Sequence, residues 1–303
     1  MQDILICAMG LDIHRDIIVA CLITGALGTD PEVEIRSFST LIPEMKKLRD
    51  WVVESDCHNV AMESTGIYWQ PIYEMLEPCF DGEINILVVN ARHMKNVPGR
   101  KTDMRDAQWI ATLLRAGLLK GSFIPGKAFR ELRHLTRYRK SIVHDITSQK
   151  NRIDKFLQSS GFRFTAFLSD AFGASGRNII RHLIQNGSMD RIALDKCLKT
   201  QTRNRIDQIL VALNGDLSLH QRRFLAMAFG HLEQLEAHRK AVEDEISSEI
   251  LKHGEALSLL CSIPGVDVTA AAAIIAEIGT DMSAFQDSQH ICSWAGLSTG
   301  NNE

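Results

Sequence analysis

Four acidic side chains occur in sequence contexts that favour a metal site. Asp12 and Glu63 fall near the ends of two short apolar segments that are typical of buried strands. Asp103 and Asp106 lie in the segment Lys-Thr-Asp-Met-Arg-Asp-Ala, where Thr102 is a suitable helix N-cap. Carboxylate oxygens are preferred ligands of Mg²⁺, and two such ions can stabilise the attacking and leaving oxygens of a phosphoryl transfer. The four acids therefore predict a Mg²⁺ or Mn²⁺ site that acts on phosphodiesters.

The second acidic pair continues the apolar stripe of a predicted helix at about 102–118. Asp103, Asp106 and Ile110 follow one another at steps of three or four residues, so all three should face the sheet rather than water. Two ionised carboxylates in that position need a compensating cation, because burying unpaired charge is costly. First-turn acids also favour the helix dipole, but that common reason does not account for the acids at the strand ends.

The first ~120 residues alternate between strand-like and helix-like segments. Apolar runs and alternating patterns predict strands at 5–12, 17–23, 32–38, 60–63 and 84–89. Helical spacing follows Pro43 and appears again after Glu63. Three consecutive strands and then strands separated by helices predict a mixed α/β sheet, an order shared with RNase H-like folds. Ligands of such sheets bind at the carboxyl ends of strands, where Asp12 and Glu63 fall.

After Pro125 the strand-like patterns largely disappear. Apolar residues recur at heptad-like spacing over 132–157 and again over 225–246, which predicts long coiled-coil-like helices. These helices should pack in pairs or against a second subunit, as in a homo-oligomer. The stretch 159–176 is rich in Ser, Gly and Phe and is predicted to be a connector or insertion. With a small helical module at the end, we expect three regions, at 1–125, 126–255 and 256–303.

The net charge of −3 conceals a strongly basic block. Residues 92–163 contain 17 lysines and arginines against 5 aspartates and glutamates, whereas the rest of the chain has 17 against 32. This asymmetry predicts a polyanionic partner, although a solvated helix face would give the same pattern. The candidate nucleic-acid contacts are Arg92, Lys95, Arg100, Lys101 and Arg105 around the acidic pair, and Arg130, Arg133, Arg137, Arg139 and Lys140 on the helix that follows.

The composition excludes several other classes of protein. The 303 residues are 45% hydrophobic and 23% charged, as in ordinary globular proteins. No apolar run approaches the ~18 residues of a membrane span, and the N-terminus lacks the features of a signal peptide. The 7 cysteines never form a C-x-x-C pair and the 11 histidines show no ligand spacing, which argues against a disulfide framework or a zinc site. We expect a cytoplasmic protein without a membrane partner.

Three segments resemble the DEDD-type insertion-sequence transposases, a family that includes the Piv-like DNA invertases. They are Gly-Leu-Asp-Ile-His at 10–14, Met-Glu-Ser-Thr-Gly-Ile-Tyr at 62–68 and Lys-Thr-Asp-Met-Arg-Asp-Ala at 101–107. The resemblance implies a RuvC-like N-terminal domain whose metal-binding and catalytic tetrad would be Asp12, Glu63, Asp103 and Asp106. It also implies DNA as the substrate, with a structured guide RNA as a further partner.

The C-terminal segment extends the resemblance. Ser262–Val266, the apolar helix after it and Trp294–Leu297 are similar to the helix-hairpin-helix-like second domain of these transposases. A Pro-Gly turn before a helix can offer backbone N–H groups to a phosphate, whereas the carboxylate of Asp267 would repel one. In the family this domain carries a serine nucleophile beyond the Ala-Gly-Leu segment. The sequence stops before that point and Ser298 is not assigned the role, so we expect a truncated chain that binds nucleic acid without exchanging strands.

Three functions are compatible with the sequence. The favoured one is a DNA transposase or site-specific recombinase that works through the metal site. The second is a truncated, recombination-deficient relative that only binds nucleic acid. The third is an actin-like or sugar-kinase-like phosphotransferase, because those proteins also begin with a Gly-x-Asp strand and turn. A second glycine-rich phosphate loop is not visible in the sequence, and a phosphotransferase would leave the basic block unexplained.

Overall fold

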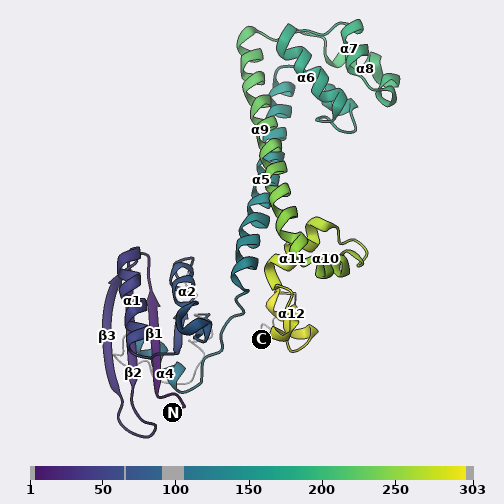
Figure 1. The fold of residues 1–303 in the computed structure, drawn as a ribbon. Coiled ribbons are helices and arrows are strands. Elements are labelled where there is room, and N and C mark those ends of the chain that lie inside the picture. Colours follow the sequence, from purple (N-terminus) through teal and green to yellow (C-terminus); the bar gives the residue numbers. More distant parts are fainter. Residues whose placement is uncertain (1–3, 65, 91–105, 298–303) are drawn as a thin grey trace, which may run out of the picture. The chain divides into compact units, whose positions relative to one another are not determined.

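The computed structural model describes residues 4–64, 66–90 and 106–297. Contacts divide the chain into two compact units, Met1–Ile124 and Pro125–Glu303, which Figure 1 shows coloured along the sequence. The first unit holds the sheet and the second is helical. Within the described residues, no helix is both long and apolar enough to cross a membrane.

The first unit is built on a mixed five-stranded sheet, as predicted. Its strands are β1 (Cys7–Ile13), β2 (Ile17–Thr24), β3 (Glu32–Ser39), β4 (Asn59–Glu63) and β5 (Asn85–Val89). They lie in the order β3-β2-β1-β4-β5. The hairpins β1–β2 and β2–β3 are antiparallel, whereas β4 is parallel to both β1 and β5. The carboxyl ends of β1, β4 and β5 therefore meet at one edge of the sheet.

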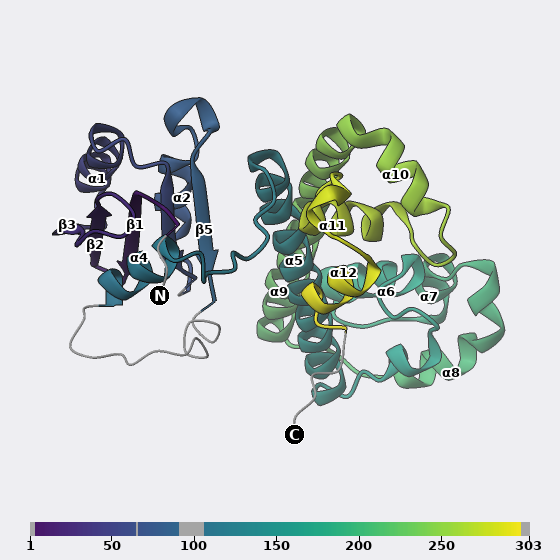
Figure 2. The ribbon, with the colours of Figure 1, turned by 90° about the horizontal axis from the view of Figure 1, so that it is seen from below.

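The two faces of the sheet are covered by different helices (Figure 2). One face packs against α1 (Ile42–Glu54) and α2 (Gln70–Leu76), and its core includes Met9 and Leu11 of β1. The other face packs against α4 (Asp106–Arg115), and its buried residues include Ala8 of β1. Alternate residues of a strand point to opposite faces, so Gly10 and Asp12 share the α4 face with Ala8. A short 3-10 turn, η1 (Cys79–Gly82), follows α2.

Helix α4 lies unusually close to β1 at Gly10. A Cβ atom added there would stand 2.2 Å from the carbonyl oxygen of Ala107 and 2.4 Å from the amide nitrogen of Ala111. Both neighbours are helix backbone, which cannot rotate away as a flexible side chain could. Glycine at this position is therefore what allows α4 to rest directly on the sheet.

The far end of α4 is fixed by a buried arginine. Arg115 is 2% exposed, and its Nε donates a hydrogen bond to the carbonyl of Leu5 at 3.1 Å. Its guanidinium also donates to the carbonyl of Gly25 at 3.2 Å. The carbonyl of Arg115 in turn accepts from the amide of Ile4 at 2.9 Å. One side chain thus ties the helix end to the start of β1 and to the β2–β3 connection.

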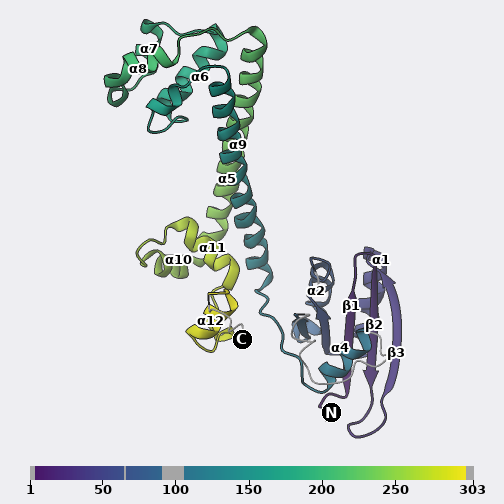
Figure 3. The ribbon, with the colours of Figure 1, turned by 180° about the vertical axis from the view of Figure 1, so that it is seen from behind.

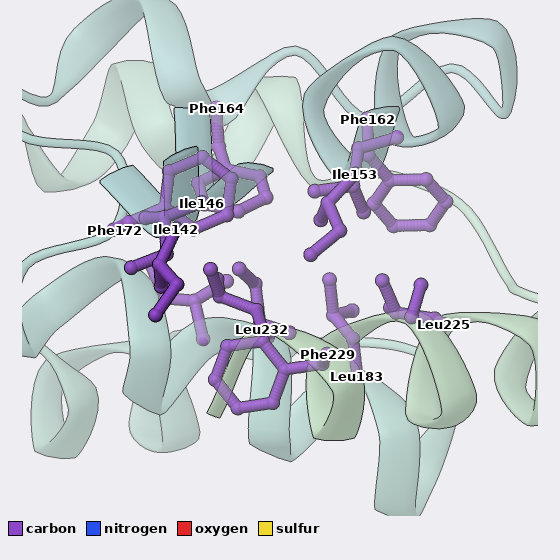
Figure 4. Packing of buried hydrophobic residues seen from close by; sticks show 14 of the residues in the cluster. Ile142, Ile146, Ile153, Phe162, Phe164, Phe172, Leu183, Leu225, Phe229 and Leu232 are labelled. Atoms are coloured by element: carbon purple, nitrogen blue, oxygen red, sulfur yellow. The ribbon is translucent and has the colours of Figure 1, made fainter. Parts of the chain in front are cut away.

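The second unit is organised around two long helices, α5 (Lys127–Ser159) and α9 (Leu219–Ile250), which run antiparallel along each other (Figures 1 and 3). The predicted apolar stripes form the contact between them. Figure 4 shows Ile142, Ile146 and Ile153 of α5 in one core with Leu225, Phe229 and Leu232 of α9. The predicted pairing of long helices is thus confirmed within one chain.

The stretch between the long helices is a folded insertion rather than a loose connector. It contains η2 (Phe164–Phe167), α6 (Ala174–Asn186), α7 (Arg191–Cys197), η3 (Thr200–Arg205) and α8 (Ile206–Ala212). Phe162, Phe164 and Phe172 are all buried in the same core as the stripes of α5 and α9 (Figure 4). The phenylalanines that gave this stretch its unusual composition are core residues.

The helices after α9 complete the second unit. They are η4 (Leu251–His253), α10 (Gly254–Cys261), α11 (Val268–Ile278), η5 (Met282–Ala284) and α12 (Ser288–Trp294). Helix α11 packs on α5 through Ile275 and its small neighbours Ala272 and Ala276. Arg133 of α5 reinforces this contact by donating to the backbone carbonyl of Glu277 at 2.7 Å and pairing with its carboxylate at 3.0 Å.

We predict that Arg133→Met lowers the free energy of unfolding by about 1–3 kcal/mol, because it removes hydrogen bonds made by a half-buried charge. Burial lowers the pKa of Arg133, while the nearby Glu277 opposes that shift. The control is Lys140→Met on the same helix, where an exposed side chain is replaced and a change within about 0.5 kcal/mol is expected. Chemical denaturation measures both variants, and equal effects would contradict the structural role of Arg133.

We also predict that Gly10→Ala destabilises the first unit by about 1–3 kcal/mol or more, because the new methyl group would overlap the backbone of α4. The matched control is Gly230→Ala in the middle of α9, where an added Cβ meets nothing within 4 Å. There the same substitution should stabilise the protein by about 0.5–1 kcal/mol, since alanine favours helix. Thermal or urea unfolding measures both, and two shifts of the same sign would refute the proposed contact.

Candidate functional site

Asp12 and Glu63 lie beside each other at the edge of the sheet. Parallel pairing of β1 with β4 matches Leu11 with Met62, so each acid stands one residue beyond a matched pair. Adjacent strands are about 4.8 Å apart. Ala61, two residues before Glu63, packs against the same helix as Ala8 of β1. Both carboxylates therefore belong to the α4 face, at the carboxyl ends of their strands.

Helix α4 approaches the same end of the sheet with Asp106. We call the region of Asp12, Glu63 and Asp106 the acidic corner. Asp106 is the first described residue of that helix. The residue after it, Ala107, has its carbonyl group directly over Gly10. Gly10 and Asp12 are two residues apart on one face of β1, which places the start of α4 near Asp12. The expectation that Asp106 faces the core is wrong, because Asp106 is exposed whereas Ala107 and Ile110 are buried. Among the described residues of α4, the buried stripe runs through Ala107, Ile110 and Leu114, which leaves Asp106 at its solvent edge.

The carboxylate of Asp12 has a neighbour that the sequence prediction missed. Its Oδ2 lies 3.3 Å from Nε2 of His14, and the Asp12 side chain is only 15% exposed against 60% for His14. Residues i and i+2 of a strand lie on one side, so the Asp-Ile-His spacing could have indicated the contact. This contact can hold the carboxylate in one orientation, as polar neighbours of ligating carboxylates do at metal sites.

The donor atoms at this corner suit a hard divalent cation. Asp12, Glu63 and Asp106 offer only carboxylate oxygens, the ligand type that Mg²⁺ and Mn²⁺ prefer. Within residues 4–64, 66–90 and 106–297, however, no group of three His, Cys, Asp or Glu side chains is arranged to hold a metal ion. Asp103, the fourth predicted ligand, lies outside the described residues. The chemistry of the described donors therefore fits the ion, while a closed ligand cluster is not present among them.

The predicted basic contacts are distributed unevenly. Arg92, Lys95, Arg100, Lys101 and Arg105 lie outside the described residues. On α5, Arg130 is buried and donates to the carbonyl of Pro125 at 3.0 Å. Arg137 joins Arg133 on the carboxylate of Glu277, with Nε at 2.8 Å, although its side chain is 65% exposed.

The next two cations on α5 differ from each other. Arg139 pairs with Glu243 of α9 at 2.7 Å and is 25% exposed. Lys140 is exposed, and within the described part of the chain it makes no ion pair. Of the predicted contacts that the structure describes, Arg137 and Lys140 are therefore the two whose charges are most open to a partner.

The turn before α11 contains a glycine with positive φ and an acidic helix cap. Gly265 adopts a φ of 88°, and the Asp267 carboxylate caps α11 by accepting from the amide of Ala270 at 2.7 Å. That hydrogen bond occupies one of the helix N–H groups that a phosphate would otherwise use. A cavity of about 650 Å³ lies beside this end, and the charges of Arg139 and Lys140 on its wall are balanced by Glu243 and Asp267. Its lining does not favour an anion.

Comparison with known families identifies both ends of the chain. A transposase family model of the DEDD, IS110 type matches residues 9–161, half of the sequence, and covers all four predicted acids. A second model, for transposases of the IS116/IS110/IS902 family, matches residues 257–303, which include the capped helix α11. No curated protein matches the chain. The two matched segments and the acidic corner of the sheet agree on one conclusion: this chain belongs to the IS110 family of DEDD-type insertion-sequence transposases.

Proposed function

We propose that the first unit is an RNase H-like, RuvC-like domain that acts on DNA phosphodiesters through a divalent-metal site. The observation that carries the proposal is the placement of Asp12 and Glu63 on neighbouring parallel strands, with the start of α4 brought to them at Gly10. The strand order β3-β2-β1-β4-β5 supports the same fold, since three antiparallel strands followed by two parallel ones are its pattern. A match to DEDD transposases gives the substrate class.

Asp12, Glu63, Asp103 and Asp106 would hold Mg²⁺ or Mn²⁺, which supplies charge stabilisation for the attacking and leaving oxygens of phosphoryl transfer. The described residues have separate tasks around that ion. His14 orients the Asp12 carboxylate, and the sheet fixes Asp12 relative to Glu63. Gly10 sets the distance at which α4 delivers Asp106. Positioning of this kind accounts for much of the catalysis in phosphoryl-transfer enzymes.

DNA is the proposed partner of the basic surface, and a structured guide RNA is the alternative polyanion for it. Arg137 and Lys140 are the described candidates on α5, together with the predicted contacts at 92–105 that the structure does not describe. The second candidate function, a relative that binds nucleic acid without completing recombination, uses the same surface. A homo-oligomer would have to use other faces of the long helices, because their apolar stripes already pack on each other.

We predict that Mg²⁺ raises the melting temperature of the protein, because a ligand that binds only the folded state stabilises it by mass action. At a hundredfold excess over its Kd the ion would contribute about 2.7 kcal/mol. Asp106→Asn should remove most of that increment while leaving the metal-free protein at least as stable, since one of several neighbouring negative charges is lost. Melting curves with Mg²⁺ and with a chelator measure both effects.

The control for this experiment is Asp30→Asn, in the β2–β3 connection at the opposite edge of the sheet from the carboxyl ends of β1 and β4. It removes the same charge and should keep the full response to Mg²⁺. A wild-type melting temperature indifferent to both Mg²⁺ and Mn²⁺, or an Asp106→Asn variant that responds like the wild type, would contradict the proposed site.

We predict that Lys140→Glu weakens DNA binding and flattens its dependence on salt. Each neutralised phosphate contributes about −0.9 to the slope of log K against log salt, so losing one contact should reduce the slope by about 0.9. Lys196→Glu on α7, another exposed lysine, makes the same charge change outside the basic block and should leave the slope unaltered. Binding titrations at several salt concentrations measure this, and identical slopes for the two variants would show that Lys140 is merely solvated.

A further inference from the structure

The loop that follows Glu63 is fixed at both ends. At its start, the amide of Ser64 donates to the carbonyl of Val89 at 2.9 Å, which continues the pairing of β4 with β5. At its end, Trp69 packs against the core on the α1 and α2 face and meets Tyr73 edge-on, with ring centroids 5.8 Å apart. The described residues on both sides of the turn at 66–68 are therefore anchored to the first unit.

Between these anchors the loop presents two apolar side chains to solvent. Ile67 is 69% exposed and Tyr68 is 39% exposed, although Trp69, which packs on the core, follows them directly. The carbonyl of Ile67 accepts from the amide of Gln70 at 3.2 Å, so the turn that displays both residues is hydrogen-bonded. Single exposed apolar residues are ordinary, but two adjacent ones on an anchored turn require a reason.

Gly66 keeps one side of the tyrosine ring clear. Its φ is 58°, a conformation that favours glycine, and an added Cβ would lie 3.6 Å from both Cδ2 and Cε2 of Tyr68. Because residue 66 has no side chain, this side of the Tyr68 ring is left uncovered by it and can accept a flat ligand.

The short distance along the chain from Glu63 to the turn indicates which ligand the turn would meet. Ile67 and Tyr68 are four and five residues beyond Glu63, so even a fully extended chain keeps them within about 14–18 Å of that acid. A base near the phosphate of a strand bound at the acids is therefore within reach of this turn. Bases stack on aromatic side chains whatever their sequence, since every base has a π-face. Tyr68 is exposed and differs in this from Trp69, which packs against the core of the first unit.

We propose that Tyr68, flanked by Ile67, is a stacking platform for an unpaired base beside the phosphate held at Asp12 and Glu63. This inference rests on the proposed function, because it takes the acids as the place where the phosphodiester lies. It assigns Tyr68 to the binding and positioning of the strand, with no part in holding the metal ion.

The test uses the full chain and a mixed-sequence single-stranded DNA of about 16 nucleotides, with a fluorescent adenine analogue placed at successive positions. Tyr68→Leu should weaken binding about 5- to 150-fold, the range that corresponds to the loss of one aromatic–base stack. Tyr68→Phe keeps the ring and should bind within about twofold of wild type. The analogue should report stacking in the wild type and in Tyr68→Phe, and lose that signal in Tyr68→Leu.

Two controls separate stacking from other causes. Ile42→Ala, an exposed isoleucine at the start of α1 with 61% exposure, should leave affinity unchanged. Tyr68→Leu should keep the melting response to Mg²⁺, which shows that the variant is folded and that the acids are intact.

Equal affinity and equal analogue signal for Tyr68→Leu and wild type would overturn the inference while the proposed metal site stands. Failure of the wild type to bind the oligonucleotide would overturn it as well. The melting response to Mg²⁺ in the same samples then shows whether the proposed function fails with it.

Discussion

The approach of α4 to β1 at Gly10 is the contact on which the acidic corner depends. A helix normally rests on a sheet through its side chains, which keeps the two backbones well apart. Here the missing Cβ of Gly10 brings the first turn of α4 against the strand, with Ala107 and Ala111 as its small contact residues. Asp106 precedes Ala107 directly, and Asp12 lies two residues beyond Gly10 on the same face. Small residues that carry no chemistry themselves thus bring the helix that carries Asp106 against the strand that carries Asp12.

The same contact explains which parts of the site can be predicted from sequence. Strand ends are marked by local patterns, so the apolar runs alone suffice to place Asp12 and Glu63 at the edge of the sheet. The sequence also places Asp106 correctly on a helix, but its side chain is exposed instead of facing the sheet. Helical periodicity gives the centre of an apolar stripe, whereas the exposure of its first residue depends on where the helix leaves the sheet.

Charges on the long helix are harder to interpret from sequence, because a basic residue looks the same whether its partner is a phosphate or a carboxylate of the same chain. Arg133 and Arg137 share Glu277, which follows them by more than a hundred residues. Arg139 likewise meets Glu243 on the opposing helix. No local pattern shows such pairings, since they arise only when α5 has packed on α9 and α11. Part of the basic block thus stabilises the packing of helices in the second unit, in addition to any part it has in binding a polyanion.

The ion pairs of α5 and the backbone contact at Gly10 differ in how far they tolerate substitution. Interhelical ion pairs at exposed positions, such as that of Arg137 with Glu277, contribute modestly and can be exchanged for other polar contacts. A backbone-to-backbone approach has no such substitute, because every residue other than glycine adds an atom where Ala107 and Ala111 already lie. A chemical site built on the first kind of contact would vary in geometry with its surroundings. The placement of α4 on β1 depends on the second kind, and Asp12 and Glu63 have the rigidity of the sheet.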